Sequence, residues 1–305
     1  MLRQVGVVGA GDVGQGIVRT LAQAEMNVIF KEVSEEKVEE ALTGIKNTLS
    51  HEINRWGLTG SERAVILSRI RGTTKMSELQ DVELTIEAII DDWEQKQALF
   101  EEMDRTLAAE MIFTTNTSTL SITELARLTK RPDRFCGMHF FSPVHKRPLV
   151  EVVRGMQTSD ETFGYVSKLV KLMGKTGIEV FEAPGFVTTR TILPFINEAM
   201  TIVMEGTASA NDVDTAMKLA YNLPQGPLEL ADTIGLDHIM VWNEQLLREL
   251  GEAKYRPCML LRKLVRAGHF GVKTQQGFFR YDHHGQRIDE DERDQDSPYS
   301  LIPKN

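Results

Sequence analysis

Gln4-Val5-Gly6-Val7-Val8 leads without a break into Gly9-Ala10-Gly11-Asp12-Val13-Gly14, and this stretch determines how the first part of the chain folds. The five leading residues predict a buried strand, and the apolar pattern after the last glycine predicts a helix. Glycines at this spacing between a strand and a helix are typical of a dinucleotide-binding turn. Gly9 permits the tight turn, Gly11 lets backbone approach a pyrophosphate, and Gly14 lets the helix pack closely. We expect Asp12, inside the turn, to point to solvent.

A second predicted strand, Asn27 to Phe30, ends at Lys31-Glu32. Glu32 therefore stands about twenty residues beyond the glycines, where an acid usually holds the ribose diol of a dinucleotide. A carboxylate at that place repels a 2′-phosphate. The sequence thus favours NAD over NADP.

A helical hairpin is predicted over residues 35–70. Apolar residues from Val38 to Trp56 recur three and four positions apart, which indicates an amphipathic helix. The breaker Gly57-Leu58-Thr59-Gly60 ends it, Ser61 offers a cap, and a second helix is expected to run to Ile70. The hairpin either forms part of a ligand wall or adds a packing layer, and the sequence leaves both interpretations open.

Strands and helices then alternate. Strands are expected at 82–88, 111–115 and 176–181, and helices at 91–109 and 159–173. The strand that ends at Thr115 is followed by Asn116-Thr117-Ser118-Thr119. Open α/β sheets bind ligands at the carboxyl ends of parallel strands, so this polar tip is a candidate ligand contact.

Ala183-Pro184-Gly185 marks the predicted domain boundary, and beyond it strand patterns disappear. The fold class is therefore α/β: a Rossmann-type doubly wound sheet over 1–183 with the inserted helical hairpin, followed by an all-α domain over 184–281. Residues 282–305 read as a polar tail, with seven acids between 282 and 296. The helices expected in the second domain are Phe186–Met204, Asn211–Ala220, Pro227–Leu250 and Pro257–Ala267.

Two neighbouring apolar runs each carry one polar group. Gly137-Met138-His139-Phe140-Phe141-Ser142-Pro143 reads as a buried strand that ends at a turn, and Glu151 lies in the middle of the next run, Leu149 to Val153. A carboxylate inside an apolar strand needs a partner, and His139 is the candidate. Such a pair leaves one imidazole nitrogen as a base. The alternative is a core histidine satisfied by a backbone carbonyl, but the pairing and the cofactor motif favour the base.

Composition narrows the class of protein. The 305 residues include 35 Lys and Arg against 44 Asp and Glu, a net charge of −9, which argues against a nucleic-acid partner. No apolar run has the length of a membrane span, and we expect neither signal peptide nor membrane anchor. Cys136 and Cys258 match no metal spacing and read as reduced thiols of a cytoplasmic protein. His283 and His284 are expected to be exposed, and no metal site is predicted.

From its first strand to about Tyr281 the chain resembles the L-3-hydroxyacyl-CoA dehydrogenase family, particularly bacterial 3-hydroxybutyryl-CoA dehydrogenases. The resemblance rests on many ordered matches, so it is very specific to the family, although it leaves substrate choice open. The matching segments are Gly9 to Gly14, Ile86-Glu87-Ala88-Ile89, Thr115-Asn116-Thr117-Ser118-Thr119, Arg131-Pro132-Asp133-Arg134-Phe135, His139-Phe140-Phe141-Ser142-Pro143-Val144, Pro184-Gly185-Phe186-Val187, Gly226-Pro227-Leu228-Glu229-Leu230-Ala231-Asp232 and Gly235-Leu236-Asp237.

The resemblance implies a role for each matching site residue. His139 looks like the base that removes the proton of the C3 hydroxyl while hydride leaves C3 for the nicotinamide. Glu151 looks like its orienting carboxylate. Ser118 looks like the hydroxyl that binds the reacting oxygen and touches the nicotinamide ribose, with Asn116 beside it. The implied cofactor contacts also include Glu32, Asp91, Lys96 and Lys273.

The chain departs from the family pattern at two positions in particular. Ser142 and Thr189 stand where the family usually has asparagine. Ser142 belongs to the implied cofactor contacts. The asparagine at the position of Thr189 normally faces the substrate near the reacting carbon. Thr189 either still donates a hydrogen bond there or marks a different acyl pocket.

The implied function is NAD-dependent oxidation of (S)-3-hydroxyacyl-CoA by a homodimer that assembles through its helical half. Lys46 and Arg55 are candidates for the phosphates of CoA, and straight-chain substrates of short and medium length are expected. Two alternatives remain: a dehydrogenase of the same fold that acts on a free 3-hydroxy acid, and a non-catalytic relative that only binds NAD. Lys146 and Arg147, where the family commonly has apolar residues, are either solvated or meet a CoA phosphate or an acyl carboxylate.

Overall fold

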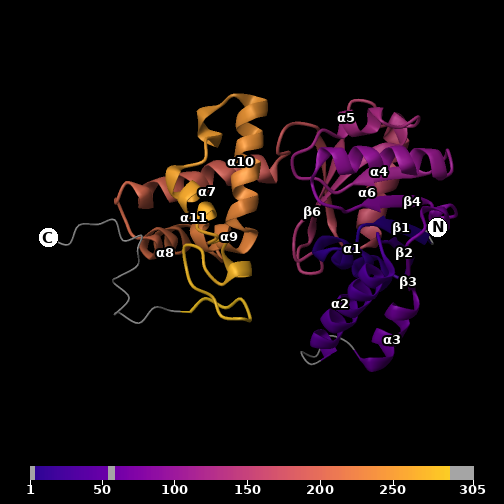
Figure 1. Cartoon of the computed structure of the whole chain (residues 1–305), viewed down its shortest axis with the longest axis horizontal. Coiled ribbons are helices and arrows are strands. Elements are labelled where there is room, and N and C mark those ends of the chain that lie inside the picture. Colours follow the sequence, from indigo (N-terminus) through magenta and orange to yellow (C-terminus); the bar gives the residue numbers. More distant parts are fainter. Residues whose placement is uncertain (1–3, 54–58, 289–305) are drawn as a thin grey trace. The chain divides into compact units, whose positions relative to one another are not determined.

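The computed structural model describes residues 4–53 and 59–288. The chain divides between Phe186 and Val187 into two compact units. Figure 1 shows strands and helices in the first unit and helices in the second. Arg55 and most of the predicted acidic tail, 289–305, lie outside the described residues.

The first unit is built on one eight-stranded sheet with the order β3-β2-β1-β4-β5-β6-β7-β8. Every neighbouring pair is parallel except β6 and β7, which are antiparallel. The chain leaves β1 toward β2 on one side and later fills β4 on the other, so the carboxyl end of β1 is the topological switch point. The strands are β1 (Gln4–Val8), β2 (Asn27–Lys31), β3 (Ile70–Thr73), β4 (Leu84–Glu87), β5 (Ile112–Thr115), β6 (Phe135–Phe140), β7 (Leu149–Arg154) and β8 (Thr176–Phe181).

Helices cover both faces of this sheet, and each face has its own apolar core. One core joins the sheet to α1 (Asp12–Gln23), α2 (Glu35–Ile53) and α6 (Asp160–Leu172). The other joins it to α4 (Trp93–Thr106) and α5 (Ile122–Arg127). Strand side chains alternate between the two cores, as the two-residue period of a strand requires. The predicted doubly wound sheet is confirmed.

The inserted hairpin consists of α2 and α3 (Gly60–Ser68), but its details differ from the expectation. Thr59, not Ser61, caps α3, because its side chain accepts from the backbone N–H of Glu62 while Glu62 bonds back to Thr59. Extending the helix to Ile70 was wrong. Ile70 opens β3, where backbone pairing with β2 at the sheet edge outweighs its apolar helical spacing.

The second unit is helical in its described part, up to residue 288. Its helices pack around one core that includes Leu193, Leu228 and Leu261. The single helix predicted over Pro227–Leu250 was wrong, because Gly235, with φ of 105°, breaks it in two. Only glycine adopts that conformation without strain. The helices are α7 (Thr188–Met204), α8 (Ala210–Tyr221), α9 (Pro227–Ile234), α10 (Leu236–Leu250) and α11 (Met259–Arg266).

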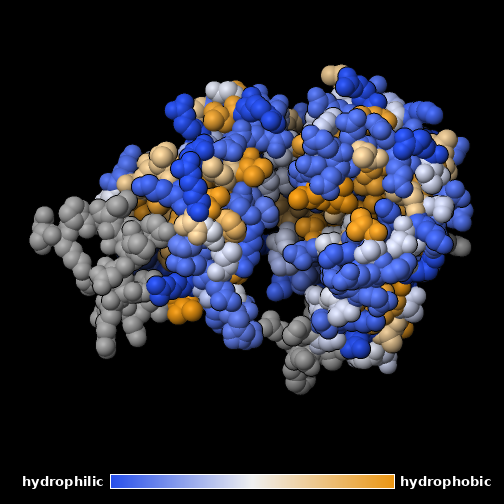
Figure 2. Space-filling model, in the orientation of Figure 1, coloured by the Kyte–Doolittle hydropathy of each residue, from blue (hydrophilic) through white to orange (hydrophobic). Residues whose placement is uncertain are grey.

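Most of the visible surface carries hydrophilic side chains (Figure 2). Within the described residues, no helix combines the length and apolar character needed to cross a membrane. Cys136 and Cys258 are free thiols, both buried, and burial raises the pKa of Cys136 to about 12. His283 and His284 are exposed. In the same part of the chain no three His, Cys, Asp or Glu side chains are grouped to hold a metal ion.

Candidate active site

The glycine turn between β1 and α1 has the geometry that a dinucleotide requires. Gly9 has φ of 91°, and a Cβ on Gly14 would lie 2.1 Å from the Gly9 carbonyl oxygen, so neither position accepts a side chain. A Cβ on Gly11 would meet no atom within 4 Å, which leaves space beside the backbone at the start of α1. The free N–H groups of that helix end favour an anion. The turn therefore fits a pyrophosphate, and Asp12 is exposed, as expected.

Glu32 lies against this turn, directly after β2. Its Oε1 accepts from the backbone N–H of Ala10 at 2.5 Å, and its Oε2 accepts from that of Val33 at 3.1 Å. These bonds hold the carboxylate at the edge of the turn. Its contact with a ribose stays a prediction.

His139 and Glu151 face each other across β6 and β7. The antiparallel register pairs them directly, which puts their side chains on the same face of the sheet. His139 Nδ1 lies 2.6 Å from Glu151 Oε2, and both side chains are buried. With Nδ1–H donated to the carboxylate, Nε2 keeps its lone pair.

Ser118 completes this arrangement from the loop after β5. Its Oγ lies 3.1 Å from His139 Nε2, so its hydroxyl can donate to that nitrogen. The three side chains form a continuous line, carboxylate to imidazole to hydroxyl, at the carboxyl edge of the sheet. Such a line can accept one proton at Nε2 and stabilise the resulting imidazolium.

Two phenylalanines hold the imidazole plane. The ring centroid of Phe141 lies 4.6 Å from that of His139, and the centroid of Phe186 lies 5.7 Å from it. Phe186 is buried although its φ is 48°, a conformation that is costly for a bulky residue. Residue-type reasoning missed both rings, because their proximity to His139 depends on tertiary structure.

Asn116 and Asp91, predicted cofactor contacts, organise the backbone of the site. Asn116 Oδ1 accepts from the N–H of Phe140 at 2.9 Å, and Asp91 Oδ2 accepts from the N–H of Ser118 at 3.0 Å. One bond ties the loop after β5 to the strand that carries His139. The other fixes the segment that carries Ser118.

Lys96 is fully buried, and its amino group donates to Glu87 Oε1 at 2.6 Å. Its distance to Asp91 Oδ1 is 3.5 Å, so it also lies near the ligand-facing loop. Burial raises the pKa of Glu87, while Lys96 and the hydroxyl of Thr115 act in the opposite direction. Sequence reasoning missed Glu87 as a site residue. The available signal was the one that identified Glu151: a carboxylate within an apolar strand.

The other predicted site residues do not belong to the hydrogen-bonded line of Glu151, His139 and Ser118 in the part of the chain that the structure describes. Ser142 is exposed in the loop after β6. Thr189 is buried in the first turn of α7. Lys273 donates to Asp237 Oδ2 at 2.5 Å within the second unit. Lys46 is exposed on α2. Their contacts with cofactor or substrate stay predictions.

Comparison with known proteins covers almost all of the described chain. Residues 4–183 match the NAD binding domain of 3-hydroxyacyl-CoA dehydrogenase, and residues 185–281 match its C-terminal domain. A probable 3-hydroxybutyryl-CoA dehydrogenase of Bacillus subtilis strain 168 is 43% identical over 281 residues, which is 92% of this chain and 98% of the relative. A 3-hydroxybutyryl-CoA dehydrogenase of Clostridioides difficile is 41% identical, over 91% of this chain and 99% of its own length.

Solved structures agree. The crystal structure of an (S)-3-hydroxybutyryl-CoA dehydrogenase from Ralstonia eutropha superimposes with a TM-score of 0.88 at 41% identity, covering 92% of this chain and all of the other. The FadB2 protein of Mycobacterium tuberculosis gives a TM-score of 0.91 at 33% identity, covering 92% of this chain and 99% of its own.

Proposed function

The chain belongs to the 3-hydroxyacyl-CoA dehydrogenase family, and from this premise we propose that His139, Glu151 and Ser118 carry its catalysis. The enzyme oxidises a 3-hydroxyacyl-CoA to the 3-oxoacyl-CoA with NAD as cofactor. The observation that supports the catalytic assignment is the unbroken line from Glu151 through His139 to Ser118, with contacts of 2.6 and 3.1 Å.

In the proposed mechanism the protein handles the proton. NAD, when bound, supplies the hydride acceptor. Ser118 binds the C3 oxygen of the substrate through its hydroxyl, and His139 Nε2 takes the C3 hydroxyl proton as the carbonyl forms. Glu151 stabilises the imidazolium that results, because its carboxylate already accepts from Nδ1–H. In the reverse direction the same imidazolium returns the proton to the oxygen.

The glycine turn would hold the cofactor. The open space at Gly11 and the N-terminus of α1 suit its pyrophosphate, and Glu32 beside Ala10 suits its adenosine ribose. Asp91 and Asn116 support the loop against which the nicotinamide half would lie. Lys96 acts behind this loop, since its side chain is fully buried.

One comparison tests this function. Wild type and His139→Gln are assayed for NADH formation with (S)-3-hydroxybutyryl-CoA and with free 3-hydroxybutyrate. We expect turnover of the CoA ester only and a loss of ~10²–10⁴-fold in the variant, with NADH binding retained. Near-normal kcat in His139→Gln would remove His139 from the mechanism, and preference for the free acid would favour a dehydrogenase of the same fold that acts on a free 3-hydroxy acid.

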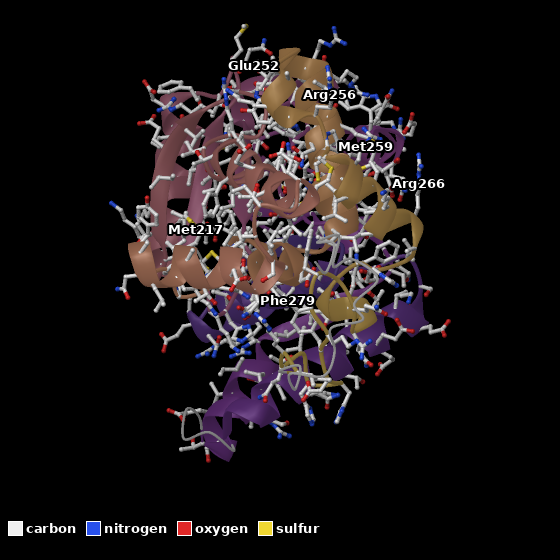
Figure 3. The ribbon with its side chains drawn as sticks, turned by 90° about the vertical axis from the view of Figure 1, so that its left-hand side faces the viewer. Met217, Glu252, Arg256, Met259, Arg266 and Phe279 are labelled. Atoms are coloured by element: carbon white, nitrogen blue, oxygen red, sulfur yellow. The ribbon has the colours of Figure 1, made fainter. Side chains whose placement is uncertain are left out.

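Assembly and location are also part of the proposal. Large apolar side chains are exposed on the second unit, including Leu219 and Tyr221 at the end of α8 and Met259 on α11; Figure 3 labels Met259. Exposed apolar side chains favour a partner surface, so we infer that the protein forms a homodimer through this unit. We also propose that the protein is located in the cytoplasm. Light scattering at micromolar concentration should give the mass of a dimer.

A further inference from the structure

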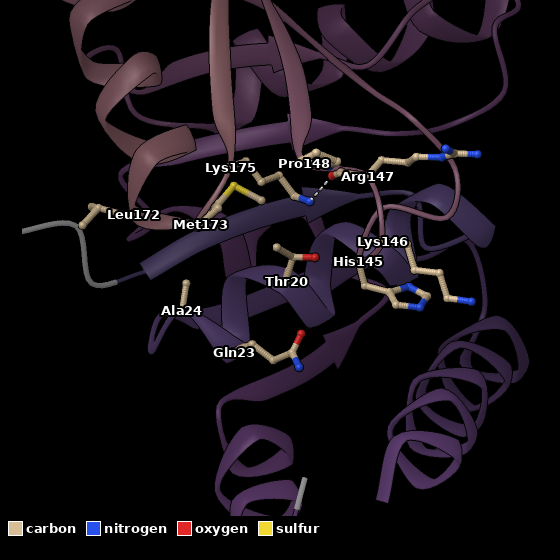
Figure 4. A pocket seen from close by; sticks show the side chains of 11 residues that line it. Thr20, Gln23, Ala24, His145, Lys146, Arg147, Pro148, Leu172, Met173 and Lys175 are labelled. Carbon is tan, nitrogen blue, oxygen red and sulfur yellow. Dashed lines mark hydrogen bonds between the residues drawn. The ribbon is translucent and has the colours of Figure 1, made fainter. Parts of the chain in front are cut away.

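A cavity of about 400 Å³ opens on the first unit, away from the glycine turn (Figure 4). Three segments line it: the second half of α1, the loop before β7, and the end of α6 with the turn after it. Among the described residues, its lining contains no aspartate or glutamate. It does contain Lys146, Arg147 and Lys175, in a chain whose net charge is −9.

Lys175 is a buried cation that pairs with no carboxylate in the part of the chain that the structure describes. Only 8% of it is exposed, and its amino group donates to the carbonyl oxygens of Val144 at 2.6 Å and Arg147 at 2.7 Å. Burial lowers the pKa of Lys175, because no described acid offsets the loss of water around its charge. An ammonium group has three donors, so one remains for a ligand.

Lys146 and Arg147 add two exposed cations at the mouth of the cavity. In residues 4–53 and 59–288 neither forms an ion pair, and the guanidinium of Arg147 has only a 3.4 Å bond to the carbonyl oxygen of Ser142. Arg154 on β7, by contrast, pairs with both Asp160 and Glu179. The cations of the cavity are therefore available to an anion.

The opposite wall comes from α1. Gln23 lines the cavity, and within the described chain its side-chain amide makes no hydrogen bond. It lies twelve residues after Gly11, a separation of ~18 Å along a helix. An anion in the cavity is therefore not the pyrophosphate at the glycine turn.

We propose that this cavity binds a phosphorylated small molecule at a site separate from the cofactor turn. A phosphomonoester dianion offers two charges and several acceptor oxygens, which match a cavity lined by three cations better than the single charge of a carboxylate does. Arg147 can bind two oxygens at once, and the lysines act as point charges. The volume exceeds that of inorganic phosphate alone and leaves room for the group that carries it. The site does not depend on the proposed catalysis.

Calorimetric titrations with saturating NADH and constant ionic strength test the site. The probes are inorganic phosphate, AMP, CoA and dephospho-CoA. The test variant is Lys146→Ala/Arg147→Ala, both exposed positions that carry no described packing. Its matched control is Arg127→Ala/Lys130→Ala, which removes two exposed cations, one at the end of α5 and one just after it, that form no ion pair with any residue the structure describes. We expect wild type and control to bind phosphate and AMP and the test variant to bind them about tenfold or more weakly.

The CoA arm identifies the source of the phosphate. If the cavity binds the 3′-phosphate of CoA, the test variant should bind CoA more weakly than wild type and dephospho-CoA equally well. If the cavity binds a free phosphorylated ligand, the test variant should bind phosphate and AMP more weakly and CoA equally well. Lys175→Met, whose folding is checked by its melting temperature, should bind the same probes more weakly than wild type does. The proposal would be overturned if wild type bound none of the probes, or if the test and control variants bound them with equal affinity. Either result would count regardless of the catalytic activity of these proteins.

Discussion

Ser118 and Asp91 are joined by a hydrogen bond from the backbone N–H of Ser118 to the Asp91 carboxylate, 3.0 Å long, across the carboxyl ends of β4 and β5. The bond leaves the hydroxyl of Ser118 for His139, whose Nε2 is 3.1 Å away. A residue expected at the cofactor thus also sets the position of the proposed catalytic hydroxyl. Hydrogen bonds of this kind position the segments that carry the proposed catalytic side chains, and the role of each residue can be tested separately.

Replacing Glu151 by glutamine should lower kcat by at least ~10²-fold. The amide oxygen can still accept from His139 Nδ1–H, but the charge that stabilises the imidazolium is lost. The comparison is with Glu179→Gln on β8, which is exposed and outside the site. Steady-state NADH formation measures both. Equal kcat in Glu151→Gln and wild type would contradict a role for the carboxylate in catalysis.

The ion pair between Glu87 and Lys96 should show strong coupling. Both side chains are fully buried, so Lys96→Met alone leaves an unpaired buried carboxylate and should cost ~3–5 kcal/mol of unfolding free energy. The double variant Glu87→Gln/Lys96→Met should lose less than the two single variants together. Urea unfolding of the four proteins gives the cycle. Additive losses would show that the pair is not coupled.

Glu32→Ala should weaken the preference for NAD over NADP. The variant removes both the proposed ribose contact and the charge that repels a 2′-phosphate, so the ratio of kcat/KM for the two cofactors should fall by about tenfold or more. Glu36→Ala, an exposed acid on α2, controls for general charge. An unchanged ratio would place Glu32 away from the ribose.

Thr189→Asn restores the residue usual in the family. If the threonine hydroxyl serves as a hydrogen-bond donor, the variant should keep or raise kcat and leave the order of acyl-chain preference unchanged. A panel of straight-chain 3-hydroxyacyl-CoAs with one dicarboxylic analogue measures this, and Thr191→Asn, an exposed position two residues further along the helix, is the control. A changed order of preference would instead assign Thr189 to the acyl pocket.

Asp232 should make the second unit less stable as pH rises from about 4 to about 7. Burial raises its pKa to about 7 from an ordinary 3.8, despite bonds from the N–H groups of Phe278 and Phe279 and the hydroxyl of Tyr281. The folded state then binds the proton more tightly than the unfolded state, so the free energy of unfolding falls through this window, by about 4 kcal/mol.

Asp232→Asn is the comparison for this pH dependence. Its amide does not titrate, so the difference in unfolding free energy between wild type and variant should shrink as pH rises. The variant should also be less stable at low pH, since its NH₂ group faces backbone donors. Parallel stability curves for the two proteins would show that Asp232 does not titrate in this range.

Sequence reasoning found features that local chemistry encodes. The glycine turn follows from spacing alone, and Glu151 was identified because an isolated carboxylate in an apolar strand needs a partner. Glu87 carried the same signal, but its partner Lys96 lies on the following helix, where a lysine ordinarily reads as exposed. The pattern of apolar residues in the sequence therefore does not reveal that pair.

Other features depend on distant segments. β3 is a short edge strand whose identity rests on pairing with β2. The break at Gly235 is stabilised by a bond from Leu236 N–H to the carbonyl of Phe270, which helical periodicity does not contain. The cavity joins α1, the loop before β7 and the end of α6. Its cations were visible in the sequence, but its walls were not.

The pairing of β6 with β7, the one antiparallel pair of neighbouring strands in the eight-stranded sheet, has a consequence for how the chain tolerates insertions and deletions. Because side chains alternate along a strand, a slip of one residue between β6 and β7 would turn Glu151 away from His139 and put a valine in its place. Length changes in the loop between these strands are harmless only while that register holds. The β6–β7 pair therefore keeps His139 and Glu151 together as one unit. Other loops at the carboxyl edge of the sheet can change in length without separating these two residues.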